Sequence, residues 1–237
     1  MSNPVRLLAI ISCYLSVMLG SVCHAQAQST GGGKQLTSLE FSCVALSKFK
    51  SPPLFYFVSG EYKPLQVPVG AHSPEYKLSN AAVLKLYVER KDEQGDVSYV
   101  QCAEAPLMMD CKRMLFIVSR TKDKSPWPLQ LLGMDDSLET FPTGSFRFMN
   151  ATRVPLEVSI NGKRDKIAPR AIAIIAPDVS ETGGFYPFTI DGPDGSRFYE
   201  TKLYGQFHGR ETVLIGPPAH DPKRLTIKFL SQVIPPR

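Results

Sequence analysis

The chain has 237 residues, of which 43% are hydrophobic, 21% charged and 10% aromatic. This composition predicts a folded globular protein and excludes an intrinsically disordered one. The formal net charge is +5, but the basic residues come as scattered pairs such as Lys112-Arg113 and Lys163-Arg164. No run of five or more like charges occurs, so the sequence predicts no nucleic-acid-binding surface.

The first 27 residues have the order of a cleaved secretory signal peptide. Arg6 precedes an uncharged apolar run over residues 7–22, and small residues end in Ala25-Gln26-Ala27. We expect cleavage after Ala27, with cleavage after Ala25 as an alternative. A lipoprotein acylated at Cys23 is a further alternative that its preceding residues disfavour. The signal predicts an exported protein, located in the periplasm, in the outer envelope or outside the cell.

The remaining chain is dominated by a two-residue period, which is typical of β-strands. We expect a flexible lead-in over residues 28–36 and an N-terminal β domain over 37–132. A connector over 133–143 then leads to a C-terminal β-sandwich domain over 144–237. The predicted fold is all-β, one or two antiparallel Ig-like sandwiches with little helix. No internal repeat aligns the two parts, and no apolar run after residue 27 is long enough to span a membrane.

Two patterns in residues 37–132 predict particular strands. Apolar and polar residues alternate over 84–88, and a polar loop at 91–96 leads into a second strand at 97–102. Residues 114–118, Met-Leu-Phe-Ile-Val, are continuously apolar. Such a run suits a strand that is covered on both faces.

The clearest hairpin signal is Asn161-Gly162, because both residues of this turn must accept a positive φ. The strand before it alternates over residues 154–160, and its Pro155 indicates an edge strand, because proline cannot donate to a ladder. A second turn is expected at 191–195. The two-residue turn predicts these cross-strand pairs: Ile160 with Lys163, Val158 with Asp165, and Leu156 with Ile167.

The connector holds the best helix signal, the capping pattern Asp136-Ser137-Leu138-Glu139. Asp135 and Asp136 are adjacent, and neighbours on a turn point apart, so we interpret them as turn and capping residues. Acid–base catalysis by this pair is the weaker interpretation.

Three cysteines remain after signal cleavage, and an oxidising compartment allows two of them to pair. Cys102 and Cys111 end and begin two strand-like runs, so we expect them to form a disulfide across a hairpin mouth. Cys43 lies on an apolar strand face and is expected to be a buried, inert thiol. Without a C-x-x-C motif the sequence predicts no metal site.

The sequence contains no recognised catalytic or nucleotide-binding motif, and no cofactor is expected. His208-Gly209-Arg210-Glu211 is the densest polar group in the second half of the chain, with His220-Asp221 nearby in sequence. The three histidines after the signal, His72, His208 and His220, are dispersed. A periplasmic hydrolase using His208 or His220 with an acidic partner is therefore the alternative function. Turn chemistry at a strand end is the favoured interpretation of the same residues.

Trp127, between two prolines, is the candidate binding residue, since a rigid aromatic ring can stack on a sugar or anchor a partner. Covering the end of the core is the alternative role for this ring. Asn150-Ala151-Thr152 matches a glycosylation sequon, which matters only in a eukaryotic secretory pathway.

Residues 144–152, Gly-Ser-Phe-Arg-Phe-Met-Asn-Ala-Thr, precede Leu-Glu-Val-Ser-Ile-Asn-Gly at 156–162. This pattern resembles the opening strands of bacterial exported β-sandwich domains of unknown function. The resemblance covers about 20 of the 237 residues and implies a fold and a location. We therefore expect an exported, noncatalytic binding or scaffolding protein of the bacterial envelope, whose partner is an envelope protein or a glycan.

Overall fold

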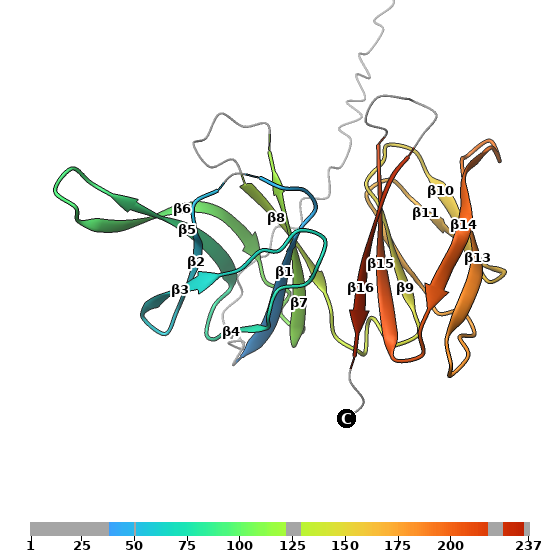
Figure 1. Cartoon of the computed structure of the whole chain (residues 1–237), viewed down its shortest axis with the longest axis horizontal. Coiled ribbons are helices and arrows are strands. Elements are labelled where there is room, and N and C mark those ends of the chain that lie inside the picture. The colour runs from blue at the N-terminus through green and yellow to red at the C-terminus, as the bar shows by residue number, and fades with distance from the viewer. Residues whose placement is uncertain (1–37, 50, 122–128, 218–224, 235–237) are drawn as a thin grey trace, which may run out of the picture. The chain divides into compact units, whose positions relative to one another are not determined.

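The computed structural model describes residues 38–49, 51–121, 129–217 and 225–234. Within these ranges the chain forms sixteen strands and no helix (Figure 1). The all-β prediction is therefore confirmed. In the described part of the chain, nothing forms a helix of the length and apolarity needed to cross a membrane.

The first eight strands, which we call the first half, form two four-stranded sheets, ordered β4-β1-β7-β8 and β3-β2-β5-β6. All their pairings are antiparallel except that of β1 with β7. The strands are β1 (Leu39–Ala45), β2 (Leu54–Val58), β3 (Glu61–Leu65), β4 (Tyr76–Leu78), β5 (Val83–Lys91), β6 (Val97–Pro106), β7 (Arg113–Arg120) and β8 (Leu129–Asp135).

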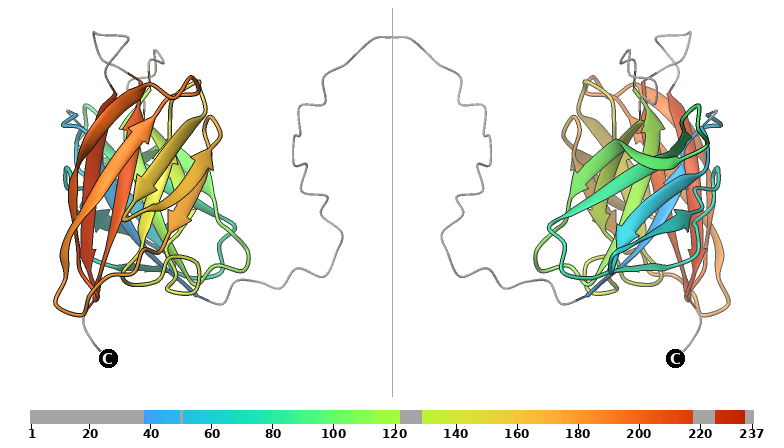
Figure 2. Two further views of the ribbon diagram at one scale, coloured as in Figure 1. Left: turned by 90° about the vertical axis from the view of Figure 1, so that its right-hand side faces the viewer. Right: turned by 90° about the vertical axis from the view of Figure 1, so that its left-hand side faces the viewer.

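The last eight strands, the second half, also form two four-stranded sheets, ordered β12-β9-β15-β16 and β11-β10-β13-β14. The left view of Figure 2 looks onto the latter sheet. The strands are β9 (Phe146–Asn150), β10 (Leu156–Ile160), β11 (Lys163–Ile167), β12 (Ile172–Ile175), β13 (Gly184–Asp191), β14 (Arg197–Gly205), β15 (Gly209–Gly216) and β16 (Thr226–Val233).

The two halves have the same topology, although the sequence aligned no repeat. Adding eight to each strand number of the first half gives the strand orders of the second. The parallel pair β1–β7 corresponds to the parallel pair β9–β15. The ladder irregularity in β5, between Leu86 and Tyr87, corresponds to that in β13, between Ile190 and Asp191. The two halves therefore share their pattern of strand pairing, although their side chains differ.

Each half buries one apolar core to which both of its sheets contribute, which is a sandwich-like arrangement. In β7, Met114, Phe116 and Val118 lie in the core of the first half. Leu115 and Ile117 point the other way and pack in a third cluster with Leu214 and Leu230 of the second half. All five residues of the apolar run at 114–118 are 0–2% exposed, which confirms that β7 is covered on both faces.

The hairpin predicted at Asn161-Gly162 is confirmed, with φ of 48° and 79° at its two residues. The ladder of β10 with β11 has the predicted pairs, from Ile160 with Lys163 to Leu156 with Ile167. The first half has the equivalent turn at Ser59-Gly60, with φ of 52° and 84°. A two-residue turn of this type therefore fixes the same register in both halves.

One expectation for the second half fails. The strand after Pro155 is not an edge strand, because β10 pairs with β11 on one side and β13 on the other. Pro155 lies just before the strand, where its missing N–H costs no ladder bond. Gln35–Arg237 form a single compact unit, and the boundaries expected at 132/133 and 143/144 stay a prediction.

The sequon asparagine is a structural residue. Asn150 is 0% exposed, and its side-chain amide donates to the carbonyl oxygens of Val154, Ile167 and Ala168. Its Oδ1 accepts hydrogen bonds from the backbone N–H and the hydroxyl of Thr152. A glycosylating enzyme could not reach this amide in the folded protein, and the side chain instead ties the end of β9 to two loops.

Candidate functional site

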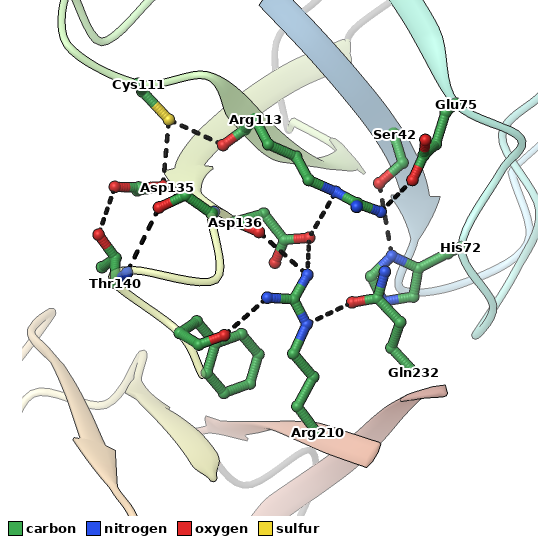
Figure 3. Close-up of polar contacts among 12 residues, drawn as sticks. Ser42, His72, Glu75, Cys111, Arg113, Asp135, Asp136, Thr140, Arg210 and Gln232 are labelled. Carbon is green, nitrogen blue, oxygen red and sulfur yellow. Dashed lines mark hydrogen bonds and ion pairs between the residues drawn. The ribbon is translucent and has the colours of Figure 1, made fainter. Parts of the chain in front are cut away.

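The most polar part of the interior is centred on the carboxylate of Asp136, which directly follows β8 and is 0% exposed (Figure 3). Its Oδ2 accepts a hydrogen bond of 2.6 Å from Nη2 of Arg210, and its Oδ1 accepts one of 3.1 Å from Nη2 of Arg147. The Nε of Arg113 lies 3.7 Å from Oδ2. One buried carboxylate therefore joins three guanidinium groups, and we call these four residues the Asp136 centre.

The strands bring these charges together from both halves of the chain. Arg113 begins β7, Arg147 lies on β9 and Arg210 lies on β15. On β15, Val213 and Ile215 enter the core of the second half, and Arg210 lies on the opposite face of the strand. Its side chain therefore points toward the first half. The Asp136 centre is thus an ionic link between the halves, beside the apolar cluster that also joins them.

Further contacts surround the two buried arginines, although Nη1 of Arg147 is buried without a hydrogen-bond partner. The ring centroid of Phe141 lies 4.0 Å from Cζ of Arg147 and 4.8 Å from Cζ of Arg210. Nη1 of Arg210 donates to the Phe141 carbonyl, and its Nε donates to Oε1 of Gln232. Burial lowers the pKa of Arg210 to about 10, although Asp136 opposes this shift. Arg113 also forms an ion pair with the half-exposed Glu75, whereas the pairs of Asp136 with Arg147 and Arg210 are buried and connect the halves.

The connector does not form the predicted helix; residues 138–140 form a turn. Asp135, and not Asp136, supplies the cap of that turn. Its Oδ1 accepts from the backbone N–H of Ser137 at 2.8 Å, and its Oδ2 accepts from the hydroxyl of Thr140 at 2.6 Å. Burial raises the pKa of Asp135, but these hydrogen bonds outweigh it and hold the value at about 2. The capping role predicted for Asp136 was wrong, because its buried carboxylate is taken by arginines.

The described histidine closest to the centre is His72, which the sequence did not select. Its Nδ1 lies 3.4 Å from Oγ of Ser42, and its pKa is lowered by burial, against the attraction of Asp136. Ser42 is only 2% exposed, and its hydroxyl does not line either of the two cavities described for the chain. The pair resembles a nucleophile with its base in composition, but neither residue lines these two cavities.

The polar group at residues 208–211 does not converge into one site. His208 is exposed and packs its ring edge-on against Phe207, with centroids 5.1 Å apart. Arg210 and Glu211 are neighbours on β15 and therefore point to opposite faces of the sheet. His220 and the predicted binding residue Trp127 lie outside the described residues.

The structure does not contain the predicted disulfide, since Cys43, Cys102 and Cys111 are all free thiols. The hairpin assumption was wrong. Strand β6 continues past Cys102 to Pro106 and pairs with β5, whereas β7 belongs to the other sheet.

Each thiol has its own surroundings. The Cys102 thiol donates to the carbonyl of Leu86, and the Cys111 thiol donates to that of Arg113. Burial raises the pKa of both to about 11, and it raises the pKa of the fully buried Cys43 thiol further. Such thiols are poor nucleophiles at neutral pH. Over the described ranges, no three His, Cys, Asp or Glu side chains are placed to hold a metal ion.

The outer surface of the sheet β3-β2-β5-β6 carries a cluster of aromatic rings. The sheet is seen in the right view of Figure 2. The Tyr62 ring stacks on Tyr99 with centroids 3.9 Å apart, and it contacts Phe57 and Tyr87 at 5.0 Å each. Phe55 contacts Tyr99 at 5.1 Å. We call these five residues the aromatic face.

The aromatic face points away from the core. Strand β2 alternates, so Leu54, Tyr56 and Val58 enter the core while Phe55 and Phe57 lie on the opposite side. Phe57 is 45% exposed and Tyr62 is 37% exposed. In the sequence, the alternation of Phe55 and Phe57 with buried residues was a signal for this surface. The other three rings come from β3, β5 and β6, so the surface could be found only once the pairing of these strands with β2 was known.

Neither a protein-family model nor a curated protein matches the chain.

Proposed function

We propose that the chain is an exported, noncatalytic binding protein of the bacterial envelope that docks a protein partner on the aromatic face. The observation that carries the proposal is the grouping of five aromatic rings on one outer sheet surface, with Phe57 and Tyr62 exposed. Clustered, exposed aromatic residues are typical of binding surfaces, where they bury large areas at low entropic cost.

A protein partner is favoured over a glycan by how the rings pack. Sugars stack on single open ring faces, whereas here Tyr62 covers a face of Tyr99 and the neighbouring rings meet edge to face. The product is a cluster of rings in mutual contact, which suits an aromatic or apolar patch on another protein.

The proposal has two further parts. We propose that each half is an Ig-like sandwich, because each pairs two four-stranded sheets over one core. Export rests on residues 1–27 alone. N-terminal sequencing of the processed protein is expected to start at Gln28 or Gln26, and retention of Met1 on a cytoplasmic protein would contradict export.

The binding proposal is tested by quantitative pull-down from envelope extract with three baits: the wild type, Tyr62→Ser, and Tyr204→Ser. Tyr204 is a matched control, because it is an exposed tyrosine of similar accessibility, 46%, on β14. We expect a protein that the wild type and Tyr204→Ser retain and Tyr62→Ser loses. Equal retention by both variants contradicts the proposal.

Protease treatment of the extract before the pull-down separates the two classes of partner. A protein partner is destroyed, so the bait retains nothing specific. Binding that survives protease and still depends on Tyr62 identifies a glycan and overturns the choice of a protein partner.

A further inference from the structure

Strand β14 forms one edge of the sheet β11-β10-β13-β14 (Figure 2). In the described part of the chain, no strand pairs with its second side. Its nine residues include no proline. An edge of this kind presents unpaired N–H and C=O groups, to which another extended segment can add as a further strand. The backbone of β14 is therefore able to accept a partner strand.

The other edges of the two wholly antiparallel sheets are protected in ways that β14 is not. Strand β3 contains Pro64, which cannot donate to a ladder. Strand β11 carries a charge at each of residues 163–166, and charges on an edge discourage pairing. Strand β6, the counterpart of β14 in the first half, lies alongside β8.

The second half is open on the side where the first half is closed. The counterparts of β6 and β8 are β14 and β16, and these two strands contribute to the wall of a cavity of about 280 Å³. Phe146, Leu203 and Phe229 supply its apolar lining, and Phe229 is 37% exposed. Apolar groups beside the β14 edge thus stay uncovered in a single chain, as is typical of a surface that a partner covers.

The order of residues along β14 indicates which partner fits this edge. The regular part of the strand begins at Tyr199, because the ladder irregularity leaves Phe198 without a counterpart on β13. Residues 199–203 then read Tyr-Glu-Thr-Lys-Leu. An acidic and a basic residue flank Thr201, and an aromatic and an aliphatic residue follow outward. This order is complementary to itself when two copies run antiparallel.

An antiparallel pair of β14 strands centred on Thr201 places Glu200 of each copy opposite Lys202 of the other. Both side chains are exposed, and within the described residues Lys202 forms no ion pair. Oε2 of Glu200 accepts a hydrogen bond of 2.7 Å from Nη1 of Arg197 in its own chain, which leaves Oε1 for Lys202. Centring the pair on Glu200 or on Lys202 would set like charges opposite each other, which is destabilising. The charges therefore favour the register centred on Thr201.

The inner face of the same pair is apolar. Opposite residues of an antiparallel pair share a face, so Tyr199 of one copy lies opposite Leu203 of the other. Both side chains pack with the core of the second half. The pairing thus continues the inner surface of the sheet and brings Tyr199 of the second copy next to the cavity that Leu203 lines.

We propose that a second copy of this chain adds to the edge of β14 and forms a two-fold symmetric dimer. The two sheets that contain β14 then become one continuous sheet. Each copy contributes the same residues, as two-fold symmetry requires. Backbone hydrogen bonds supply the attraction, and the two Glu200–Lys202 pairs set the register. This interface is additional to the aromatic face, which belongs to the first half.

Sedimentation equilibrium of the mature protein over a range of concentrations tests the dimer. A contact through residues 199–203 of each copy is small, so we expect a dissociation constant on the order of tens of micromolar. A protein that stays monomeric up to about a millimolar concentration overturns the proposal.

Two charge reversals test the register. Glu200→Lys and Lys202→Glu each set like charges opposite each other, so we expect each variant alone to dimerise at least about five-fold more weakly. An equimolar mixture of the two variants is expected to associate again, because opposite charges then face each other. Glu181→Lys, at an exposed loop position, is the control with the same change in net charge as Glu200→Lys. Equal dimerisation of Glu200→Lys and Glu181→Lys, or a mixture that associates no better than its components, overturns the assignment to β14.

Tyr62→Ser separates this dimer from docking on the aromatic face. We expect this variant to dimerise like the wild type, whatever the outcome of the pull-down. A dimer that Tyr62→Ser abolishes and Glu200→Lys leaves intact would lie on the aromatic face, and this result overturns the proposed β14 interface.

Discussion

Arg113 and Arg210 occupy corresponding positions in the two halves of the fold, and both point toward the carboxylate of Asp136. Each directly precedes a residue that pairs with a buried phenylalanine of the equivalent parallel strand: Met114 pairs with Phe41 on β1, and Glu211 pairs with Phe146 on β9. Arg113 approaches Oδ2 of Asp136 to 3.7 Å and Arg210 to 2.6 Å. The equivalent strands β7 and β15 thus each supply an arginine to the buried carboxylate of Asp136. The repeated topology therefore places the ion pairs that stabilise the contact between the halves.

Removing the charge of Asp136 is expected to destabilise the protein strongly. Asp136→Asn leaves Arg147 and Arg210 buried without their counterion, a change that typically costs about 3–5 kcal/mol. Urea denaturation of the purified protein measures this loss. Asp178→Asn is the control, because the side chain of Asp178 is 94% exposed and its ion pair with Lys163 is at the surface. Equal stability of the two variants would show that the Asp136 centre does not hold the halves together.

Asn150→Ala is expected to cost about 3 kcal/mol, since three carbonyl oxygens and two groups of Thr152 lose their partner in the interior. The matched control is Gln130→Ala, which truncates an exposed amide side chain on β8. Thermal unfolding followed by circular dichroism compares the two. A loss below about 0.5 kcal/mol, the usual range for surface substitutions, would contradict the structural role of Asn150.

Asp135 makes the stability depend on pH in the acid range. Its pKa is about 2 in the folded protein, against an ordinary value of 3.8, so the folded state favours the ionised form. The resulting stabilisation is complete above pH 4 and is lost as the pH falls from about 4 to about 2. Asp135→Asn is expected to lower the urea midpoint at pH 7 and to narrow its difference from the wild type at pH 3. A constant difference at both pH values would contradict this titration.

The cysteines give a direct chemical test of the strand arrangement. With β6 and β7 in different sheets, the purified mature protein is expected to show three reactive thiols after denaturation without reductant. The native protein is expected to react slowly, because burial raises the pKa of each thiol. A single reactive thiol in the denatured sample would contradict this arrangement and support the Cys102–Cys111 disulfide.

Local signals in the sequence predicted local structure correctly. Asn161-Gly162 fixed a hairpin and its register, because only a few residue types accept a positive φ at both turn positions. The apolar run at 114–118 predicted a strand covered on both faces. What covers its second face, however, is set by Leu214 and Leu230, about a hundred residues later in the chain.

The failures have a common cause, which is pairing between distant segments. Cys102 and Cys111 are close in sequence, but Cys102 lies on β6, which pairs with β5, and Cys111 precedes β7, which pairs with β1 and β8. Asp136 has a capping pattern around it, and only the arrival of Arg147 and Arg210 from later strands makes it an ion-pair centre. The aromatic face likewise needs four strands to assemble, so no single stretch of sequence displays it.

Binding through the aromatic face is tested most directly by photo-crosslinking in living cells. p-Benzoylphenylalanine replaces Phe57 in one strain and Phe185 in another. Phe185, which is 69% exposed on β13, is the control. We expect a discrete adduct with one protein from position 57 and none of that mass from position 185. The same adduct from both positions, or none from position 57 in the folded, exported protein, would contradict the proposed docking surface.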